Sequence, residues 1–236
     1  MSILKSFVSR FPGGKNLARS VSNFRRGRKL TQIGDTEARF THIYENNRWQ
    51  DSESVSGAGS TLDITENIRG EIPRLFEGFA IASMLDAPCG DYNWFQMIER
   101  GKVRYIGGDI VKALVESNTS KFEDDTTSFM QLDITRDALP DVDLWLCRDC
   151  LIHLSFDLID QTLANFERSS VRYLLASNYP EVAENHDIPT GHVRMLNMSL
   201  QPFNFPAPLT TIGDRAEDFP SKELALWDRA QLFPQV

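Results

Sequence analysis

The stretch Ser83-Met-Leu-Asp-Ala-Pro-Cys-Gly-Asp91 decides the fold of this 236-residue chain. It predicts a short buried strand that delivers Asp86 to its carboxyl end, then a tight Pro-Cys-Gly turn and an amphipathic helix over residues 92–100. In an open parallel sheet, ligands bind outside the carboxyl ends of the strands, where turn amides and a helix N-terminus can hold a polar group. The stretch therefore predicts an α/β protein with a ligand site beside its first strand, although any strand–turn–helix unit could share the pattern.

Two further predicted strands also end in acidic residues. Residues 103–110 form the second, and its Asp109 lies 19 residues after Gly90. At that offset a carboxylate can accept both ribose hydroxyls of a nucleoside cofactor. After a predicted helix over 111–121, residues 128–134 form the third strand, with Asp133 near its end. One such acid is commonly a helix cap, but acids at three successive strand ends favour a nucleotide site.

These motifs resemble those of class I S-adenosylmethionine-dependent methyltransferases over about residues 40–233. The resemblance rests on Asp86-Ala-Pro-Cys-Gly90, Asp109, Asp133, and the Cys-Arg-Asp149 that ends a fourth predicted strand at 142–149. It implies a Rossmann-like three-layer α-β-α sandwich whose mostly parallel, seven-stranded sheet ends in a C-terminal antiparallel hairpin, here 209–212 and 224–227. The chain departs from the family at Pro88, where glycine is usual, so amide contacts must come from neighbours such as Cys89.

The resemblance implies S-adenosylmethionine as cofactor and S-adenosylhomocysteine as product. The methionine part of the cofactor would face Asp86, Ala87, Pro88, Cys89, Gly90 and Asp91. The ribose would face Asp109 and Ile110, and the adenine would face Asp133 and Ile134. Arg148 would be a further contact. An earlier segment with Trp49, Gly57, Gly59 and Ser60 would cover the cofactor as a flap, or else be a packed surface loop. A helix is expected over 61–79, with Pro73 at a kink or break.

In this family the end of the fourth strand faces the departing methyl group, so Arg148, Asp149 and His153 are the catalytic candidates. A base with a pKa near neutrality can take a hydroxyl proton, and histidine is the residue most readily poised there. Asp149 would orient the imidazole or take the proton itself. The alternatives are a histidine packed under the helix predicted over 156–166, and a helix-capping role for Asp149.

A long segment without periodicity follows the fifth predicted strand, 171–179. Loops of this length are usually functional, so the acceptor candidates are Asn178, Asp187, His192, Arg194 and Phe203; a lid without substrate contact is the alternative. Cys147-x-x-Cys150 has no second pair, so we expect no metal site. A Mg²⁺ site of Asp149, Asn178 and Asp187 is a minor alternative.

Charge divides the chain into two parts. Residues 1–30 contain eight basic side chains and no acid, whereas the other 206 residues carry 17 basic and 33 acidic side chains, a balance of −16 within the total of −8. We therefore expect a basic amphipathic extension at 1–30 and a cofactor-binding domain at 31–236, with 31–80 covering the cofactor. The extension would lie at an anionic membrane surface, act as a transit peptide, or be a docked or disordered terminus.

These properties bound the function. The acidic body disfavours broad nucleic-acid binding, and no apolar run suits a membrane span. Three cysteines suit a reducing compartment, so we expect a cytoplasmic protein. It would be peripheral to the inner membrane if residues 1–30 bind there. Gly-x-Gly-x-x-Gly is absent after the first strand, which disfavours a dinucleotide oxidoreductase. The chain also looks like stand-alone bacterial methyltransferases that modify glycans and surface polymers. With a membrane-surface helix at 1–30, this resemblance implies O-methylation of a saccharide or glycan intermediate, with a lipid-linked glycan as partner. The alternatives are methylation of a small metabolite, protein or RNA, and a non-catalytic S-adenosylmethionine-binding module.

Overall fold

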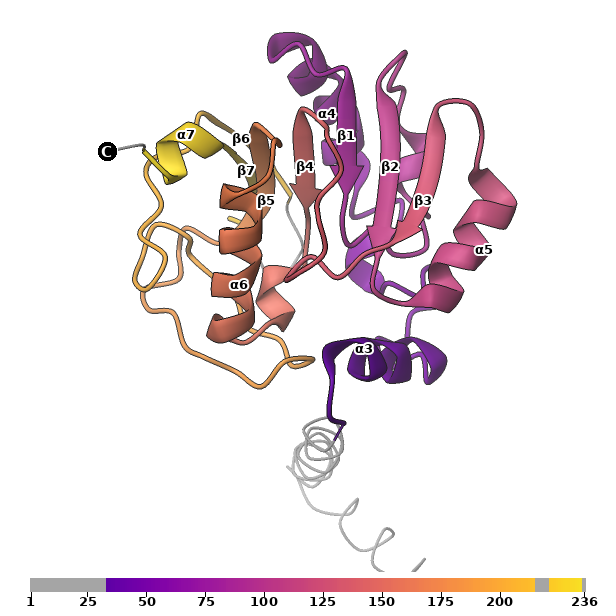
Figure 1. The fold of residues 1–236 in the computed structure, drawn as a ribbon, viewed down its shortest axis with the longest axis horizontal. Coiled ribbons are helices and arrows are strands. Elements are labelled where there is room, and N and C mark those ends of the chain that lie inside the picture. The colour runs from indigo at the N-terminus through magenta and orange to yellow at the C-terminus, as the bar shows by residue number, and fades with distance from the viewer. Residues whose placement is uncertain (1–32, 215–220, 235–236) are drawn as a thin grey trace, which may run out of the picture.

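A computed structural model describes residues 33–214 and 221–234 (Figure 1). The expectations for residues 1–30 lie outside these described residues. The described chain forms a seven-stranded sheet in the order β3-β2-β1-β4-β5-β7-β6. Its strands are β1 (Ser83–Asp86), β2 (Arg104–Asp109), β3 (Thr127–Gln131), β4 (Leu144–Cys147), β5 (Tyr173–Asn178), β6 (Thr210–Gly213) and β7 (Glu223–Asp228).

Strands β1 to β5 pair in parallel, and β7 runs antiparallel to both of its neighbours, β5 and β6. All residues of β4 and β5 are buried, as expected for strands covered on both faces. Strands β2 and β3 follow on one side of β1, and β4 and β5 lie on its other side, so the strand order reverses at β1. Such a reversal places a crevice at the carboxyl end of β1. The predicted Rossmann-like architecture, with its C-terminal antiparallel strands, is confirmed.

Helices cover both faces of the sheet (Figure 1). The helices are α3 (Thr36–Glu45), α4 (Glu66–Gly78), α5 (Lys112–Phe122), α6 (Phe156–Glu167) and α7 (Arg229–Leu232), with 3-10 turns η1 (Ala58–Ser60), η2 (Phe95–Met97) and η3 (Leu151–His153). Helix α4 buries Ile68, Ile72 and Phe76 against one face. On the other face, Ile159 and Phe166 of α6 share a core with the segment that follows β5.

Two helix predictions were wrong in extent. The predicted helix over 92–100 is only the short turn η2, because Tyr92 has a φ of 59° and its ring packs among Phe95, Tyr105 and Phe129. The predicted helix over 61–79 begins at Glu66, and Pro73 lies inside it without dividing it.

Helix α3 was not predicted. Asp35 caps it by accepting a hydrogen bond from the Ala38 amide. In Figure 1 the helix lies beyond the arrowheads of the parallel strands, at the edge where the crevice opens. Of residues 31–80, α3 and the segment after it cover this edge, whereas α4 packs on the sheet. No helix in the described part of the chain is long and apolar enough to cross a bilayer.

Candidate active site

A cavity of about 430 Å³ opens at the carboxyl ends of the parallel strands. Its inner wall is formed by the ends of β1, β2 and β4 and by the residues after β3, and its outer wall by α3, the segment 55–60 and residues 193 and 195. This volume is in the range of small-molecule sites. The predicted cofactor and catalytic residues that line it are Trp49, Gly57, Gly59, Ser60, Asp86, Pro88, Cys89, Gly90, Asp91, Asp109, Ile110, Asp133, Ile134, Arg148, Asp149 and His153.

Asp109 joins the ends of β2 and β1. Its carboxylate accepts hydrogen bonds from the Gly90 amide at 3.1 Å and the Val111 amide at 3.0 Å. Burial raises the pKa of Asp109 to about 6, although these amides oppose the shift. Each carboxylate oxygen has a further lone pair, so this side chain can accept from hydroxyl groups of a ligand in the cavity.

Asp86, at the end of β1, is the most strongly perturbed acid that lines the cavity. Its side chain is 3% exposed and accepts a hydrogen bond of 2.8 Å from the Tyr105 hydroxyl. Burial raises its pKa to about 7, against the opposing effects of Tyr105 and Arg148. An acid that ionises near neutrality in a cleft is a candidate partner for a cationic ligand group.

Asp91 anchors the segment that covers the cavity. Its carboxylate accepts hydrogen bonds from the Ser54 and Ser56 hydroxyls and the Val55 amide, at 2.9 to 3.2 Å. Asp91 was expected to open a helix, but its carboxylate binds this distant segment. Gly90, with a φ of 57°, lies so close to Ser56 that a Cβ there would collide with the hydroxyl. The flap expected around Gly57 is therefore fastened to the turn after β1.

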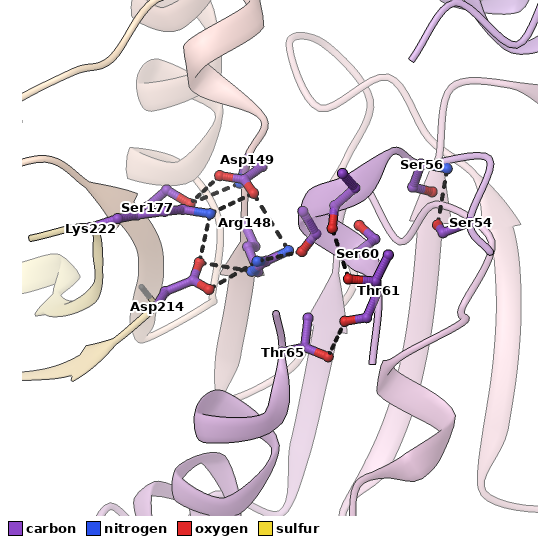
Figure 2. Close-up of polar contacts among 12 residues, drawn as sticks. Ser54, Ser56, Ser60, Thr61, Thr65, Arg148, Asp149, Ser177, Asp214 and Lys222 are labelled. Carbon is purple, nitrogen blue, oxygen red and sulfur yellow. Dashed lines mark hydrogen bonds and ion pairs between the residues drawn. The ribbon is translucent and has the colours of Figure 1, made fainter. Parts of the chain in front are cut away.

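Four charged side chains, three of them buried and Asp149 partly exposed, form a network beside the flap (Figure 2). Arg148 binds Asp214 through Nε at 2.8 Å and Nη2 at 2.9 Å. Lys222 bridges Asp149 at 2.7 Å and Asp214 at 2.9 Å. Ser177 donates to Asp149 at 3.1 Å. The two cations and two carboxylates balance, which offsets the cost of burying them.

This network revises the roles predicted for Arg148 and Asp149. Every guanidinium nitrogen of Arg148 contacts a protein group, including the Gly59 carbonyl at 2.8 Å, so Arg148 positions the flap and neighbouring carboxylates. Burial favours a higher pKa for Asp149, but Arg148 and Lys222 outweigh it and hold the pKa well below its usual range. Asp149 is thus a poor proton acceptor at neutral pH.

Lys222 and Asp214 were missed in the sequence. They flank β6 and β7, far along the chain from Arg148, and no local spacing links them. In the sequence they are two of the six charged residues within 214–223, and no feature of that segment distinguishes them.

His153 keeps the features required of a general base. Its Nδ1 lies 2.8 Å from the carbonyl oxygen of His192. A carbonyl only accepts, so Nδ1 carries the hydrogen and the lone pair of the neutral ring is on Nε2. Burial lowers the pKa of His153, against the His192 carbonyl and Asp149. The predicted orienting role of Asp149 belongs instead to the His192 main chain.

No protein-family model and no curated protein sequence matches this chain. Its fold matches solved structures. The 1,6-didemethyltoxoflavin-N1-methyltransferase of Burkholderia thailandensis is 14% identical, with a TM-score of 0.57 over 81% of this chain and 86% of that one. The magnesium protoporphyrin IX methyltransferase of Synechocystis PCC 6803 is 16% identical, with a TM-score of 0.53 over 84% of this chain and 99% of that one. The N-methyltransferase NodS of Bradyrhizobium japonicum WM9 is 12% identical, with a TM-score of 0.54 over 70% of this chain and 96% of that one.

The fold is that of class I methyltransferases. At these identities the likeness establishes the methyltransferase fold, and the reaction has to be argued from the site. The chain spans 41% of human N-acetylserotonin methyltransferase and 66% of a bacterial Hen1 methyltransferase domain, with TM-scores of 0.46 and 0.43.

Two residues predicted to bind the cofactor, Ala87 and Asp133, are bonded to other parts of the protein. Ala87 is fully buried and does not line the cavity, because its backbone pairs with β4 and the Trp145 indole. Asp133 lines the cavity, but its carboxylate also accepts from the Thr135 amide and hydroxyl and pairs with Arg136.

None of the five predicted acceptor residues lines the cavity of the methyltransferase fold. Asn178 forms hydrogen bonds with Glu223 and the Met198 amide, and Asp187 accepts one from the Phe156 amide at the start of α6. His192 bonds His153 through its main-chain carbonyl, and Arg194 donates to the Leu151 carbonyl. The ring of Phe203 packs on that of Phe156. They hold the long segment on the core. The sequence did not indicate these structural contacts, because polarity in a long loop does not distinguish groups that bind ligand from groups that satisfy the loop's own backbone.

The described residues contain no group of three His, Cys, Asp or Glu side chains that could hold a metal ion. Asp149, Asn178 and Asp187, the minor Mg²⁺ alternative, each have separate protein partners. Cys89, Cys147 and Cys150 are free and buried.

Proposed function

We propose that this chain is an S-adenosylmethionine-dependent methyltransferase that transfers a methyl group to a hydroxyl. The observation that carries the proposal is Asp109, a buried carboxylate that faces the cavity while bonded to the Gly90 amide of the turn after β1. The relatives from Synechocystis PCC 6803 and Burkholderia thailandensis, whose fold this chain shares, hold S-adenosylmethionine and S-adenosylhomocysteine.

The residues present fit this cofactor. The pair of hydroxyls on its ribose suits Asp109, its cationic groups suit the acidic turn at Asp86, and its adenine suits the apolar wall at Ile110 and Ile134. The sulfonium supplies an activated methyl group, so the protein needs only to position the acceptor and receive a proton. We assign that proton to Nε2 of His153.

The proposal extends to the acceptor only as far as a hydroxyl. Its support is the His153 tautomer, with Nε2 left as an acceptor on a side chain that lines the cavity. A saccharide or a lipid-linked glycan stays a prediction from the sequence.

Calorimetric titration with S-adenosylhomocysteine tests the cofactor. We expect saturable binding by the unaltered protein and a loss of at least about tenfold in affinity for Asp109→Asn, because a charge-assisted hydrogen bond contributes about 1.5–3 kcal/mol. Gly90 and Val111 donate to different oxygens of Asp109, so asparagine can accept from only one of these amides, and thermal unfolding of the variant checks that it remains folded.

The matched control is Asp124→Asn, which makes the same change in an exposed turn where Asp124 accepts from Thr126. We expect it to bind like the unaltered protein. Absence of binding by the unaltered protein, or equal affinity in both variants, would contradict the cofactor assignment.

A further inference from the structure

The outer wall of the cavity is apolar where it approaches His153. Among the described residues, four large hydrophobic side chains are exposed, and two of them, Trp49 at 39% and Val193 at 58%, line this cavity. The Trp49 and His153 rings lie 5.7 Å apart. Half-buried Met195 also lines this side. Exposed apolar side chains gathered at a cavity indicate a ligand with an apolar face.

The charges of the cavity disfavour an anionic ligand beside this wall. The lysine and arginine that line it in the described ranges are Arg148 and Lys222, and both pair with Asp149 and Asp214. Asp86, Asp91, Asp109 and Asp133 add further acidic groups to the lining. An acceptor carrying a carboxylate or phosphate would thus meet repulsion from these acids, and both cationic side chains of the lining are already paired.

Three polar side chains of the segment that carries Val193 and Met195 are committed to the protein. Asn185 and Asn197 bond backbone groups of the segment 180–201, and Thr190 bonds Ser155. A saccharide needs many hydrogen-bond partners, because each hydroxyl loses water on binding. Of this segment, Val193 and Met195 line the cavity, and neither side chain can donate a hydrogen bond to a sugar hydroxyl.

We infer that the acceptor is an uncharged hydroxyaromatic compound whose ring lies against Trp49, Val193 and Met195. This inference rests on the proposed function. The acceptor oxygen forms a bond to the methyl carbon as the bond from that carbon to sulfur breaks, and the electron pair stays on sulfur. The hydroxyl proton passes to Nε2 of His153 and then to solvent. A rigid ring loses little conformational freedom on binding, and its face suits a tryptophan.

Three probes test this class on protein saturated with S-adenosylhomocysteine. They are 2-naphthol, its anionic analogue 6-hydroxy-2-naphthoate, and methyl α-D-glucopyranoside, each titrated by calorimetry. We expect saturable binding of 2-naphthol, at least about tenfold weaker binding of the naphthoate, and no saturable binding of the glucoside. Tighter binding of the naphthoate or the glucoside, or no saturable binding of 2-naphthol, would overturn the inference.

A pair of exposed positions supplies the variants. Val193→Asp places a charge on the wall and should weaken 2-naphthol binding at least about tenfold while leaving S-adenosylhomocysteine affinity within twofold. Leu209→Asp makes a comparable change at a residue 44% exposed that does not line the cavity, and should have no effect. Unchanged 2-naphthol affinity in Val193→Asp would overturn the assigned wall.

Failure of the proposed function is distinguishable from failure of this inference. If S-adenosylhomocysteine does not bind, the cofactor assignment falls. The same probes and variants titrated into the protein alone would still decide whether the wall takes an uncharged aromatic ring.

Discussion

The imidazole of His153 is held by a main-chain carbonyl 39 residues further along the chain. The segment that supplies it is itself fixed, because the amides of Gly191 and Arg194 donate to the carbonyls of His153 and Ile152. This arrangement sets the tautomer without using an acid, and Asp149 is left to the ionic network. At this scale the reactive nitrogen is defined by backbone geometry.

Replacing His153 by glutamine should separate chemistry from binding. Glutamine can still donate to the His192 carbonyl, but it cannot take a proton, so we expect methyl transfer to a hydroxyl acceptor to fall about 100-fold or more. S-adenosylhomocysteine affinity should stay within twofold. In the unaltered enzyme the rate should rise with pH through the lowered pKa of His153 and then level, because the neutral ring is the active form. A variant with undiminished turnover would exclude His153 as the base.

The sequence located individual acids better than it located their partners. Asp86, Asp109 and Asp133 were predicted to line the site because the end of each strand can be read from local pattern, and all three do line the cavity. The partners of Arg148 and Asp149 could not be predicted, because Asp214 reaches Arg148 and Lys222 reaches Asp149 only through the pairing of β7 with β5 and β6. That pairing is a long-range property of the sheet.

At the scale of elements, the flap is joined to the strand ends by the Arg148 bond to the Gly59 carbonyl and by a close approach to the turn after β1. Gly90 and Ser56 touch, and Asp91 binds the residues around that contact. The segment lacks a hydrophobic core of its own, so its position depends on these polar contacts. Loss of the contact should therefore be felt as lost ligand affinity.

Gly90→Ala tests this dependence. The new Cβ would collide with Ser56 at a backbone φ that favours glycine, so we expect a loss of about 1–3 kcal/mol in the free energy of unfolding and at least about tenfold in S-adenosylhomocysteine affinity. Gly70→Ala is the control, because Gly70 lies within α4 with open space around it, and alanine there should stabilise by up to about 1 kcal/mol. Thermal unfolding and calorimetry give the two readouts. Normal affinity in Gly90→Ala would show that the flap does not depend on the contact.

Element boundaries followed local pattern wherever burial and periodicity agreed. Helix α6 was expected over 156–166 and occupies Phe156–Glu167. The helix expected after Asp91 does not form, because its aromatic residues pack in the same core cluster as α4. Tertiary packing overrode the helical spacing of the sequence. Helix α3 carried a readable signal that was not used, Asp35 as an N-cap ahead of spaced Phe40, Ile43 and Tyr44.

At the scale of the whole molecule, burial of two acids gives stability a particular pH dependence. The folded-state pKa values of Asp86, about 7, and Asp109, about 6, lie above the ordinary value of 3.8. The folded protein therefore holds protons that the unfolded chain has released. Stability from these groups is fully present below the unfolded pKa and declines as pH rises from about 4 to about 7.

Asp86→Asn should remove the larger part of this decline. Asparagine can still accept from the Tyr105 hydroxyl, so we expect the variant to exceed the unaltered protein by roughly 2–4 kcal/mol at pH 8 and to match it near pH 4. Denaturant unfolding between pH 5 and 8 measures the difference. The surface control Asp124→Asn should show no such trend over this range. A constant gap between Asp86→Asn and the unaltered protein would refute a titrating Asp86.

The place of β7 has a consequence for biosynthesis. β7 follows β6 in the chain yet lies between β5 and β6 in the sheet, so a nascent chain that has emerged from the ribosome only through β6 has an open edge at β5. Lys222, directly before β7, emerges at the same moment and brings a cation to Asp149 and Asp214. Closure of the sheet and completion of the ionic network therefore coincide, and an unfinished chain cannot present a finished site.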